Sequence, residues 1–316
     1  MALLEVKNVS KLYKARNTGK KASFAAVDGV SLSVEAGKCV GLVGESGCGK
    51  STLARLILGI EAPTGGRVEF DGYTVGEIKK NNTLRQSLQM VYQDSADAVN
   101  YRMSIADILG EPLENFYHLK GEERRARVKE LLERVDLTEE CMDKFPRQFS
   151  MGQLQRVCIA RALASNPKLI VMDEPLSSLD VSVQAQILNE LADLKEQLGL
   201  AYLLISHDLE AVYYLSDAIY VMYGGAIMES IQSMEDFESL IHPYSKKLLA
   251  SCPAYRNRED STAVEEAAAT AEFSLGCPYA ARCAKAQKHC FSQKPILKQV
   301  SPGHMVACHE QAKGAK

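Results

Sequence analysis

The chain has 316 residues and a formal net charge of −3, with 46% hydrophobic and 24% charged residues. A chain of this length can bury a core without disulfide or metal staples, and its small negative charge gives no overall attraction to nucleic acid. Apolar stretches such as Ala201–Ile205 fall far short of the roughly 20 residues that cross a bilayer, and the N-terminus lacks a signal-peptide layout. We therefore expect a cytosolic protein, in which nine cysteines indicate buried thiols or metal ligands rather than disulfides.

The most informative segment of the N-terminal part is a glycine-rich loop. After strand-like segments at Leu3–Val9, Val30–Val34 and Lys38–Val43, residues 44–51 read Gly-Glu-Ser-Gly-Cys-Gly-Lys-Ser, and a helix-like stretch, Ser51–Leu58, follows. Glycines let backbone N–H groups face phosphates at a helix N-terminus. The residue at 50 would neutralise phosphate charge and the hydroxyl at 51 would bind Mg²⁺. The alternative is a strand–helix turn with a chance Lys-Ser pair. The residues predicted to hold the nucleotide here are Gly44, Ser46, Gly47, Cys48, Gly49, Lys50, Ser51 and Thr52.

Further along the chain, strand-like and helix-like segments alternate, which is typical of an α/β core. The apolar periodicity predicts helices over Glu122–Val135, Gln153–Ala164 and Val183–Gln197, and strands over Arg67–Phe70, Lys168–Met172 and Ala201–Ile205.

An acidic pair, Asp173 and Glu174, directly follows the strand predicted over Lys168–Met172. Asp173 would hold Mg²⁺, and Glu174 would accept a proton from the attacking water or orient it. Alone, such a pair is equally well read as the start of a solvated loop. The upstream phosphate loop makes the catalytic interpretation the better one.

Residues 149–156, Phe-Ser-Met-Gly-Gln-Leu-Gln-Arg, resemble the Leu-Ser-Gly-Gly-Gln signature of the ATP-binding cassette (ABC) family. The segment stands about 20 residues before the acidic pair, as that family requires. Four other residues match family motifs: Gln93 the Q-loop glutamine that reaches Mg²⁺ and the water, Asp180 the D-loop, His207 the switch histidine, and Tyr13 the adenine-stacking aromatic. Alone, His207 would more often be a cap or surface residue, and Tyr13 a packing residue. The ordered set is specific to the family.

The resemblance implies a P-loop NTPase fold: a RecA-like core, an antiparallel β subdomain, a helical signature subdomain at about residues 95–165 and a small C-terminal appendix. It implies ATP and Mg²⁺ as ligands, with ATP held between two cassettes. Ser150, Gly152 and Gln153 would then donate to the nucleotide bound on a partner cassette. Met151 replaces a signature glycine, so we expect a working but slower composite site, and little ATPase activity from this chain alone.

Two further segments resemble the oligopeptide/dipeptide/nickel importer branch. One begins at Gln93-Asp94-Ser95, and the other is His242-Pro243-Tyr244. This resemblance implies a subunit peripheral to the cytoplasmic face of the cell membrane. Its partners would be a second, different ATPase, two transmembrane permeases and an extracytoplasmic solute-binding protein, with no nucleic acid. Di- or oligopeptides are the expected solute, with nickel as the alternative. An exporter ATPase, or a soluble cassette protein acting on ribosomes or DNA, fits less well.

The C-terminal part divides by composition into the end of the cassette domain (1–255), a linker (256–272) and a cysteine-bearing tail (273–316). The tail cysteines, Cys277, Cys283, Cys290 and Cys308, lack the paired Cys-x2-Cys spacing of a zinc ribbon. From the residues alone, a metal site and unliganded thiols in a small helical tail are equally good interpretations. The resemblance to peptide-importer ATPases favours a [4Fe–4S] cluster over Zn²⁺. His289, His304 or His309 could replace one ligand.

Overall fold

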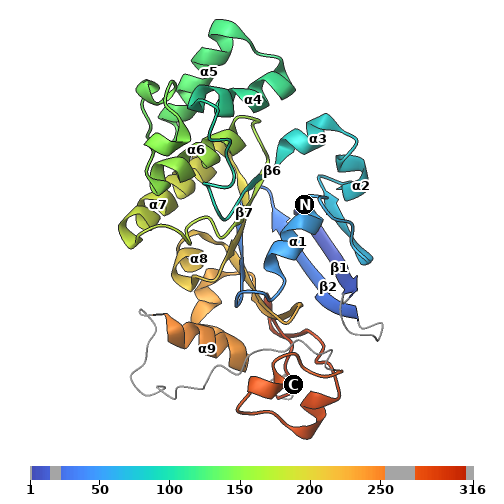
Figure 1. Ribbon diagram of the computed structural model, residues 1–316. Coiled ribbons are helices and arrows are strands. Elements are labelled where there is room, and N and C mark those ends of the chain that lie inside the picture. Colours follow the sequence, from blue (N-terminus) through green and yellow to red (C-terminus); the bar gives the residue numbers. More distant parts are fainter. Residues whose placement is uncertain (1, 15–22, 253–274, 311–316) are drawn as a thin grey trace. The chain divides into compact units, whose positions relative to one another are not determined.

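The computed structural model describes residues 2–14, 23–252 and 275–310 (Figure 1). The chain forms two compact units. The first contains Met1–Leu4, Val34–Cys39 and Glu69–Ile205, and the second contains Glu5–Ser33, Val40–Val68 and Ser206–Lys316. Among the described residues, no helix is both long and apolar enough to span a membrane.

The first unit is built around three parallel strands, β6 (Leu88–Val91), β7 (Leu169–Asp173) and β8 (Ala201–Ser206). Strand β7 lies between the other two, in a register that places Val91 opposite Met172. Every residue of β7 and β8 is buried, as expected for parallel strands covered on both faces.

Helices of the first unit pack with one another beside these strands. They are α2 (Val75–Ile78), α3 (Asn82–Ser87), α4 (Ile105–Tyr117), α5 (Gly121–Glu133), α6 (Met151–Leu163) and α7 (Val181–Leu198), with short 3₁₀ turns η1 (Glu139–Cys141) and η2 (Pro146–Gln148). Helices α4, α5 and α6 pack against one another, the green to yellow-green group in Figure 1, and α6 also contacts β6 and α7. Helix α6 therefore connects the helical group to β6, the parallel neighbour of β7.

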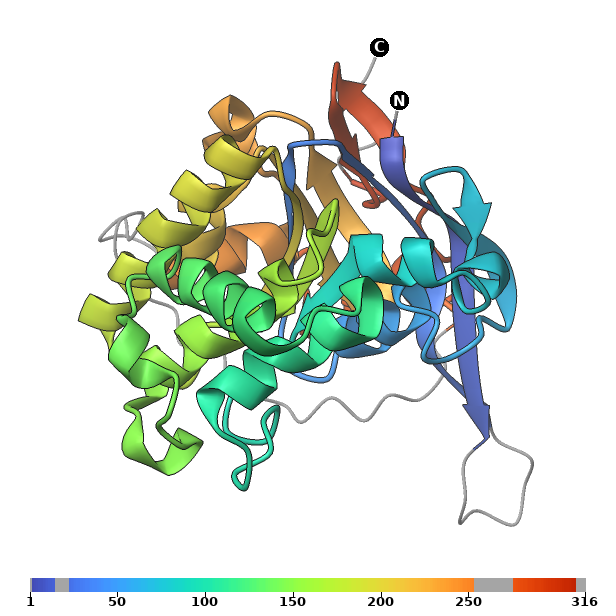
Figure 2. The ribbon, with the colours of Figure 1, turned by 90° about the horizontal axis from the view of Figure 1, so that it is seen from above.

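In the second unit, β3 (Cys39–Val43) pairs in parallel with β9 (Ala218–Tyr223), which is followed by antiparallel neighbours. These are β10 (Ala226–Ile231), β12 (His304–Val306) and β11 (Lys298–Ser301), in that order. The C-terminal segment thus extends the sheet that carries the phosphate loop, as the orange and red strands of Figure 2 show. The remaining elements of this unit are α1 (Lys50–Ile57), α8 (Leu209–Leu215), α9 (Pro243–Ser251), and the 3₁₀ turns η3 (Met234–Ser239), η5 (Ala280–Arg282) and η6 (Lys288–Phe291).

A second sheet has the strand order β2-β1-β4-β5. Its strands are β1 (Ala2–Lys14), β2 (Ser23–Glu35), β4 (Gly65–Phe70) and β5 (Tyr73–Thr74), and β4 pairs antiparallel with β5.

The α/β class and every segment predicted above as a helix or strand are confirmed. Strand β1 ends five residues later and β2 begins seven residues earlier than predicted, and the other ends agree within two residues. The tail differs from the small helical segment of the thiol interpretation, because it contributes β11 and β12 to a sheet. The linker predicted at 256–272 lies outside the described residues. The domain boundaries at 255 and 273 stay predictions.

Candidate functional site

The glycine-rich loop connects β3 to α1, the strand–loop–helix context that phosphate binding requires. Two of its glycines are required by their surroundings. A Cβ on Gly44 would lie 2.2 Å from the carbonyl oxygen of Met222, and one on Gly49, where φ is 111°, would lie 2.1 Å from that of Ala26. The loop is therefore pressed against neighbouring backbone at both ends.

Inside this loop, the Lys50 ammonium donates to the carbonyl oxygens of Gly44 (2.6 Å) and Glu45 (3.1 Å). Ser46 and Gly47 are exposed, while Ser51 and Thr52 are half-buried in the first turn of α1. The exposed loop crest, a cation and a helix N-terminus together suit a polyphosphate. The Cys48 side chain is buried, and burial raises the pKa of its thiol.

Two other predicted ATP-site residues belong to the same unit. Tyr13 donates its hydroxyl to Glu61 (2.6 Å) and stacks on Phe24 with ring centroids 6.2 Å apart. Its pKa is raised by burial and by Glu61, with the hydroxyl of Thr52 opposing, which places Tyr13 near α1. His207 is exposed at the end of β8, next to Asp208, which caps α8.

The acidic pair lies at the carboxyl end of β7 in the first unit. Asp173 is 6% exposed, and Glu174 is half-buried with a left-handed backbone (φ 48°) and an N–H that donates to the Ile205 carbonyl at 2.8 Å. Non-glycine residues in this conformation are uncommon and often belong to functional sites. Glu174 is therefore held in an uncommon backbone conformation directly after β7.

Gln93 is exposed just beyond β6, the parallel neighbour of β7. It thus stands at the same edge of the sheet as the acidic pair. Arg161 of α6 donates to the Ala98 carbonyl at 2.6 Å, which ties the segment after Gln93 to the signature helix.

The predicted signature begins α6. Ser150 and Gln153 form a reciprocal capping box, and a Cβ on Gly152 would lie 2.5 Å from the Val183 side chain of α7. Met151 is 39% exposed, so its bulk does not fill the packed face of the helix. Asp180 caps α7, and hydrogen bonding from Ser182 and Val183 lowers its pKa.

The predicted ATP-site residues are therefore divided between the two units. Tyr13, His207 and the phosphate loop belong to the second unit, whereas Gln93, the acidic pair, the signature and Asp180 belong to the first.

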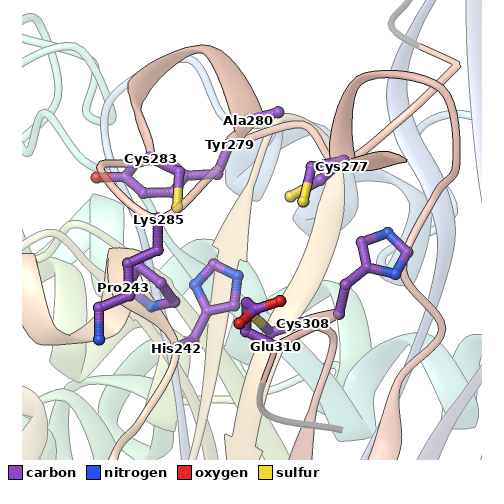
Figure 3. Close-up of a pocket in the computed structure, with 11 residues that line it drawn as sticks. His242, Pro243, Cys277, Tyr279, Ala280, Cys283, Lys285, Cys308 and Glu310 are labelled. Atoms are coloured by element: carbon purple, nitrogen blue, oxygen red, sulfur yellow. The ribbon is translucent and has the colours of Figure 1, made fainter. Parts of the chain in front are cut away.

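The four tail cysteines line one pocket of the second unit, together with His242, Tyr279 and other residues shown in Figure 3. The Cys277 N–H donates to the Cys290 carbonyl at 2.7 Å, so residues 13 apart in the sequence are brought together. Burial, with the neighbouring thiols adding, raises the pKa of Cys277 to about 11 and also raises that of Cys283. Four soft sulfur donors around one cavity fit an iron–sulfur cluster or Zn²⁺ in their chemistry.

Histidines near this pocket have different surroundings. The ligand atoms of His289, Cys290 and His309 all lie within 4.8 Å of one another. His304 instead bonds Glu229 at 2.8 Å in a buried pair, so it is not placed to replace a cysteine. His242, quoted above only as a branch hallmark, lines the pocket; burial lowers its pKa to about 4, and its Nδ1 accepts from the Tyr244 N–H at 3.0 Å.

Comparison with known proteins decides the family. A family model described as ABC transporter matches residues 27–177, and one described as oligopeptide/dipeptide transporter, C-terminal region, matches residues 228–290. The chain is 40% identical over 318 residues to the oligopeptide transport ATP-binding protein AppF of Bacillus subtilis, covering 97% of both chains. The chain belongs to the ATP-binding cassette transporter family.

Other relatives agree with this cassette assignment. The dipeptide transport ATP-binding protein DppF of Haemophilus influenzae is 39% identical over 313 residues, covering 97% of this chain and 96% of the relative. Among solved structures, the dimeric post-hydrolysis state of the cassette MJ0796 bound to ADP and Pi matches with a TM-score of 0.65 at 30% identity. It covers 72% of this chain and 97% of that one. The predicted fold and ATPase class of the chain are confirmed.

Proposed function

We propose that this cassette ATPase powers the import of di- or oligopeptides through separate permease subunits. The observation that carries the proposal is the pair of family matches in one chain: a cassette with a complete phosphate loop, and the C-terminal region of oligopeptide/dipeptide transporters. The names of AppF and DppF support a peptide solute, and no relative reported above names nickel. Nickel import stays an alternative to be tested.

In the proposed reaction, backbone N–H groups of the phosphate loop and the Lys50 ammonium hold the phosphates. Ser51, with Gln93 and Asp173, would surround Mg²⁺ once nucleotide is bound. Glu174 would orient the attacking water or take its proton, and His207 would contact the γ-phosphate. Gln93 and His207 are both exposed.

The signature residues would act on a second cassette. Ser150 and Gln153 stand exposed at the N-terminus of α6, where a helix favours anionic groups. We propose that they complete the ATP site of a partner ATPase, whose own signature completes the site on this chain. Two permeases and an extracytoplasmic binding protein would form the rest of the importer, and the chain would lie on the cytoplasmic side of the membrane.

We further propose that the cysteine pocket holds a [4Fe–4S] cluster, with Zn²⁺ as the alternative. Support comes from the four thiols that line one cavity. The compact group of His289, Cys290 and His309 would suit a single Zn²⁺ ion instead. Binding of the cluster or ion would hold Cys277, Cys283, Cys290 and Cys308 together. It would thereby stabilise the tail, which has little core of its own.

The test is anaerobic purification of the tagged chain from native membranes, followed by identification of bound subunits, metal analysis and ATPase assays in proteoliposomes. We expect co-purifying permeases, and stimulation of the ATPase by a binding protein loaded with peptide. Stimulation by a nickel-loaded binding protein alone would replace the peptide proposal with metal uptake. Absence of any permease would contradict import. Iron with acid-labile sulfide would support the cluster, and zinc alone would refute it.

A further inference from the structure

The second residue of the phosphate loop, Glu45, is held from the C-terminal part of the chain. Its backbone N–H donates to the hydroxyl of Tyr244 at 2.8 Å, across 199 residues of sequence. Its carboxylate pairs with the Arg282 guanidinium at 2.5 Å, across 237 residues. Both ends of this one residue are therefore fixed by elements outside the loop.

Arg282 is placed for this role by its own surroundings. It closes η5 directly before Cys283, its side chain is 12% exposed, and it also donates to the Tyr223 hydroxyl at 3.3 Å. A guanidinium with two acceptors and little exposure has few alternative positions. An ion pair of this kind holds its partner more firmly than a pair of solvated surface side chains.

An aromatic cluster supports the contact. Tyr223, Tyr244 and Tyr279 come from β9, α9 and the tail, and their ring centroids lie 4.7 to 5.3 Å apart. All three rings are buried. Edge-to-face and tilted rings at such distances pack favourably, so this cluster supports the Tyr244 hydroxyl that accepts from the Glu45 N–H.

A second connection reaches the middle of the loop. The Gly225 N–H donates to the Cys48 carbonyl at 2.9 Å. The preceding residue, Gly224, is so close to Pro278 of the tail that an added Cβ would lie 2.8 Å from the proline ring. The tail therefore contacts the Gly224–Gly225 turn, which is hydrogen-bonded to Cys48, in addition to contacting Glu45.

We propose that Arg282 is a positioning residue for ATP binding: through Glu45 it holds the phosphate loop, so the C-terminal segment sets the affinity of the cassette for nucleotide. A loop already held in one conformation loses less entropy when phosphates bind. Arg282 does not touch the reacting atoms, so its removal changes nucleotide affinity rather than the chemical step. The proposal is argued from the contacts of Glu45 and Arg282 and not from what the cysteine pocket binds.

The test is equilibrium binding of a fluorescent ATP analogue to the full chain and to Arg282→Gln, Glu45→Gln and the double variant. We expect each single variant to bind about three- to tenfold more weakly, and the double variant no more weakly than either single one, because both remove the same pair. Arg282→Lys should recover part of the affinity. In the assembled transporter, the KM for ATP should rise while kcat stays within about twofold.

Lys294→Gln is the matched control. Lys294 also ties the tail to the body of the unit, through Asp28 at 2.5 Å, but without touching the phosphate loop. We expect this variant to bind the analogue like wild type, and thermal unfolding should show all variants folded. Unchanged affinity in Arg282→Gln, additive losses in the double variant, or an equal loss in Lys294→Gln would each overturn the proposal. Failure of the wild-type chain to bind the analogue would instead refute the nucleotide site itself.

Discussion

At the scale of single residues, Glu174 shows how sequence and structure contribute different information. The sequence predicts its role from its place after an apolar strand and next to Asp173. The structure adds a left-handed backbone and a hydrogen bond to the neighbouring strand β8. This conformation fixes the start of the carboxylate side chain at the sheet edge, where Gln93 also lies.

Glu174→Gln should therefore lower ATP hydrolysis of the assembled transporter by a factor of about 10² or more, because an amide cannot accept the proton of water. ATP binding should be retained, since the amide keeps the shape of the side chain. Steady-state hydrolysis and analogue binding measured on one preparation check this. Substantial hydrolysis by the variant would remove Glu174 from its role.

Met151→Gly should leave hydrolysis by the assembled transporter unchanged or raise it. The methionine side chain is partly exposed beside the helix N-terminus, and its backbone N–H is present in either variant. Comparison of kcat for the two proteins measures the effect. A clear loss of activity would show that the methionine itself contributes to the composite site.

At the scale of elements, helices α6 and α7 carry a buried charge between them. Glu190 of α7 is 8% exposed, and its nearest cation is Arg156 of α6, with Nε 3.3 Å from the carboxylate. Burial raises the pKa of Glu190 to about 7, with Arg156 opposing and Asp136 adding. Above that pH the buried carboxylate is charged and therefore lowers the free energy of unfolding.

The pKa of Glu190 in the folded protein lies above its ordinary value of 4.5. The side chain therefore contributes its full stabilisation to the folded state below about pH 4.5, and this contribution is lost as the pH rises through about 7. Glu190→Gln should thus unfold like wild type near pH 4.5. At pH 8 it should be more stable by about 1 to 3 kcal/mol, because Arg156 still donates to the Val135 carbonyl. Urea unfolding at both pH values tests this. A stability difference that does not vary with pH would contradict it.

A second element-scale contact docks the tail. The Glu229 carboxylate on β10 is fully buried and accepts from the N–H groups of Ile241 (2.7 Å) and His242 (3.1 Å), and from His304 of β12 (2.8 Å). Glu229→Ala should cost about 3 to 5 kcal/mol and expose the tail to protease. His304→Ala should cost less, because the carboxylate keeps two donors. Urea unfolding and proteolysis of both variants measure these costs. An equal loss of stability in Glu229→Ala and His304→Ala would contradict the prediction.

The sequence predicts the local elements of this fold well but not its long-range contacts. Helix α6 and strand β7 follow from apolar periodicity. The gathering of four tail cysteines does not follow from their spacing, because it depends on β12 pairing with β10. The Arg282–Glu45 pair joins residues 237 apart, and no local pattern in either segment predicts it.

At the scale of the whole molecule, the residues expected to act on ATP are distributed over both compact units, and the signature is expected to serve a second cassette. In the proposed function, two cassettes would close on nucleotide and reopen after hydrolysis. Because the signature is expected to act on a partner cassette, we expect the isolated chain to be a weak ATPase. The permeases and a second cassette would supply what one chain lacks.

The most direct test of this account is accumulation of labelled di- and oligopeptides in vesicles that contain the reconstituted transporter, the binding protein and ATP. We predict ATP-dependent accumulation with the wild-type chain and none with Glu174→Gln. Peptide accumulation that is equally fast with both proteins, or ATP-driven uptake of nickel in place of peptides, would contradict the central claim.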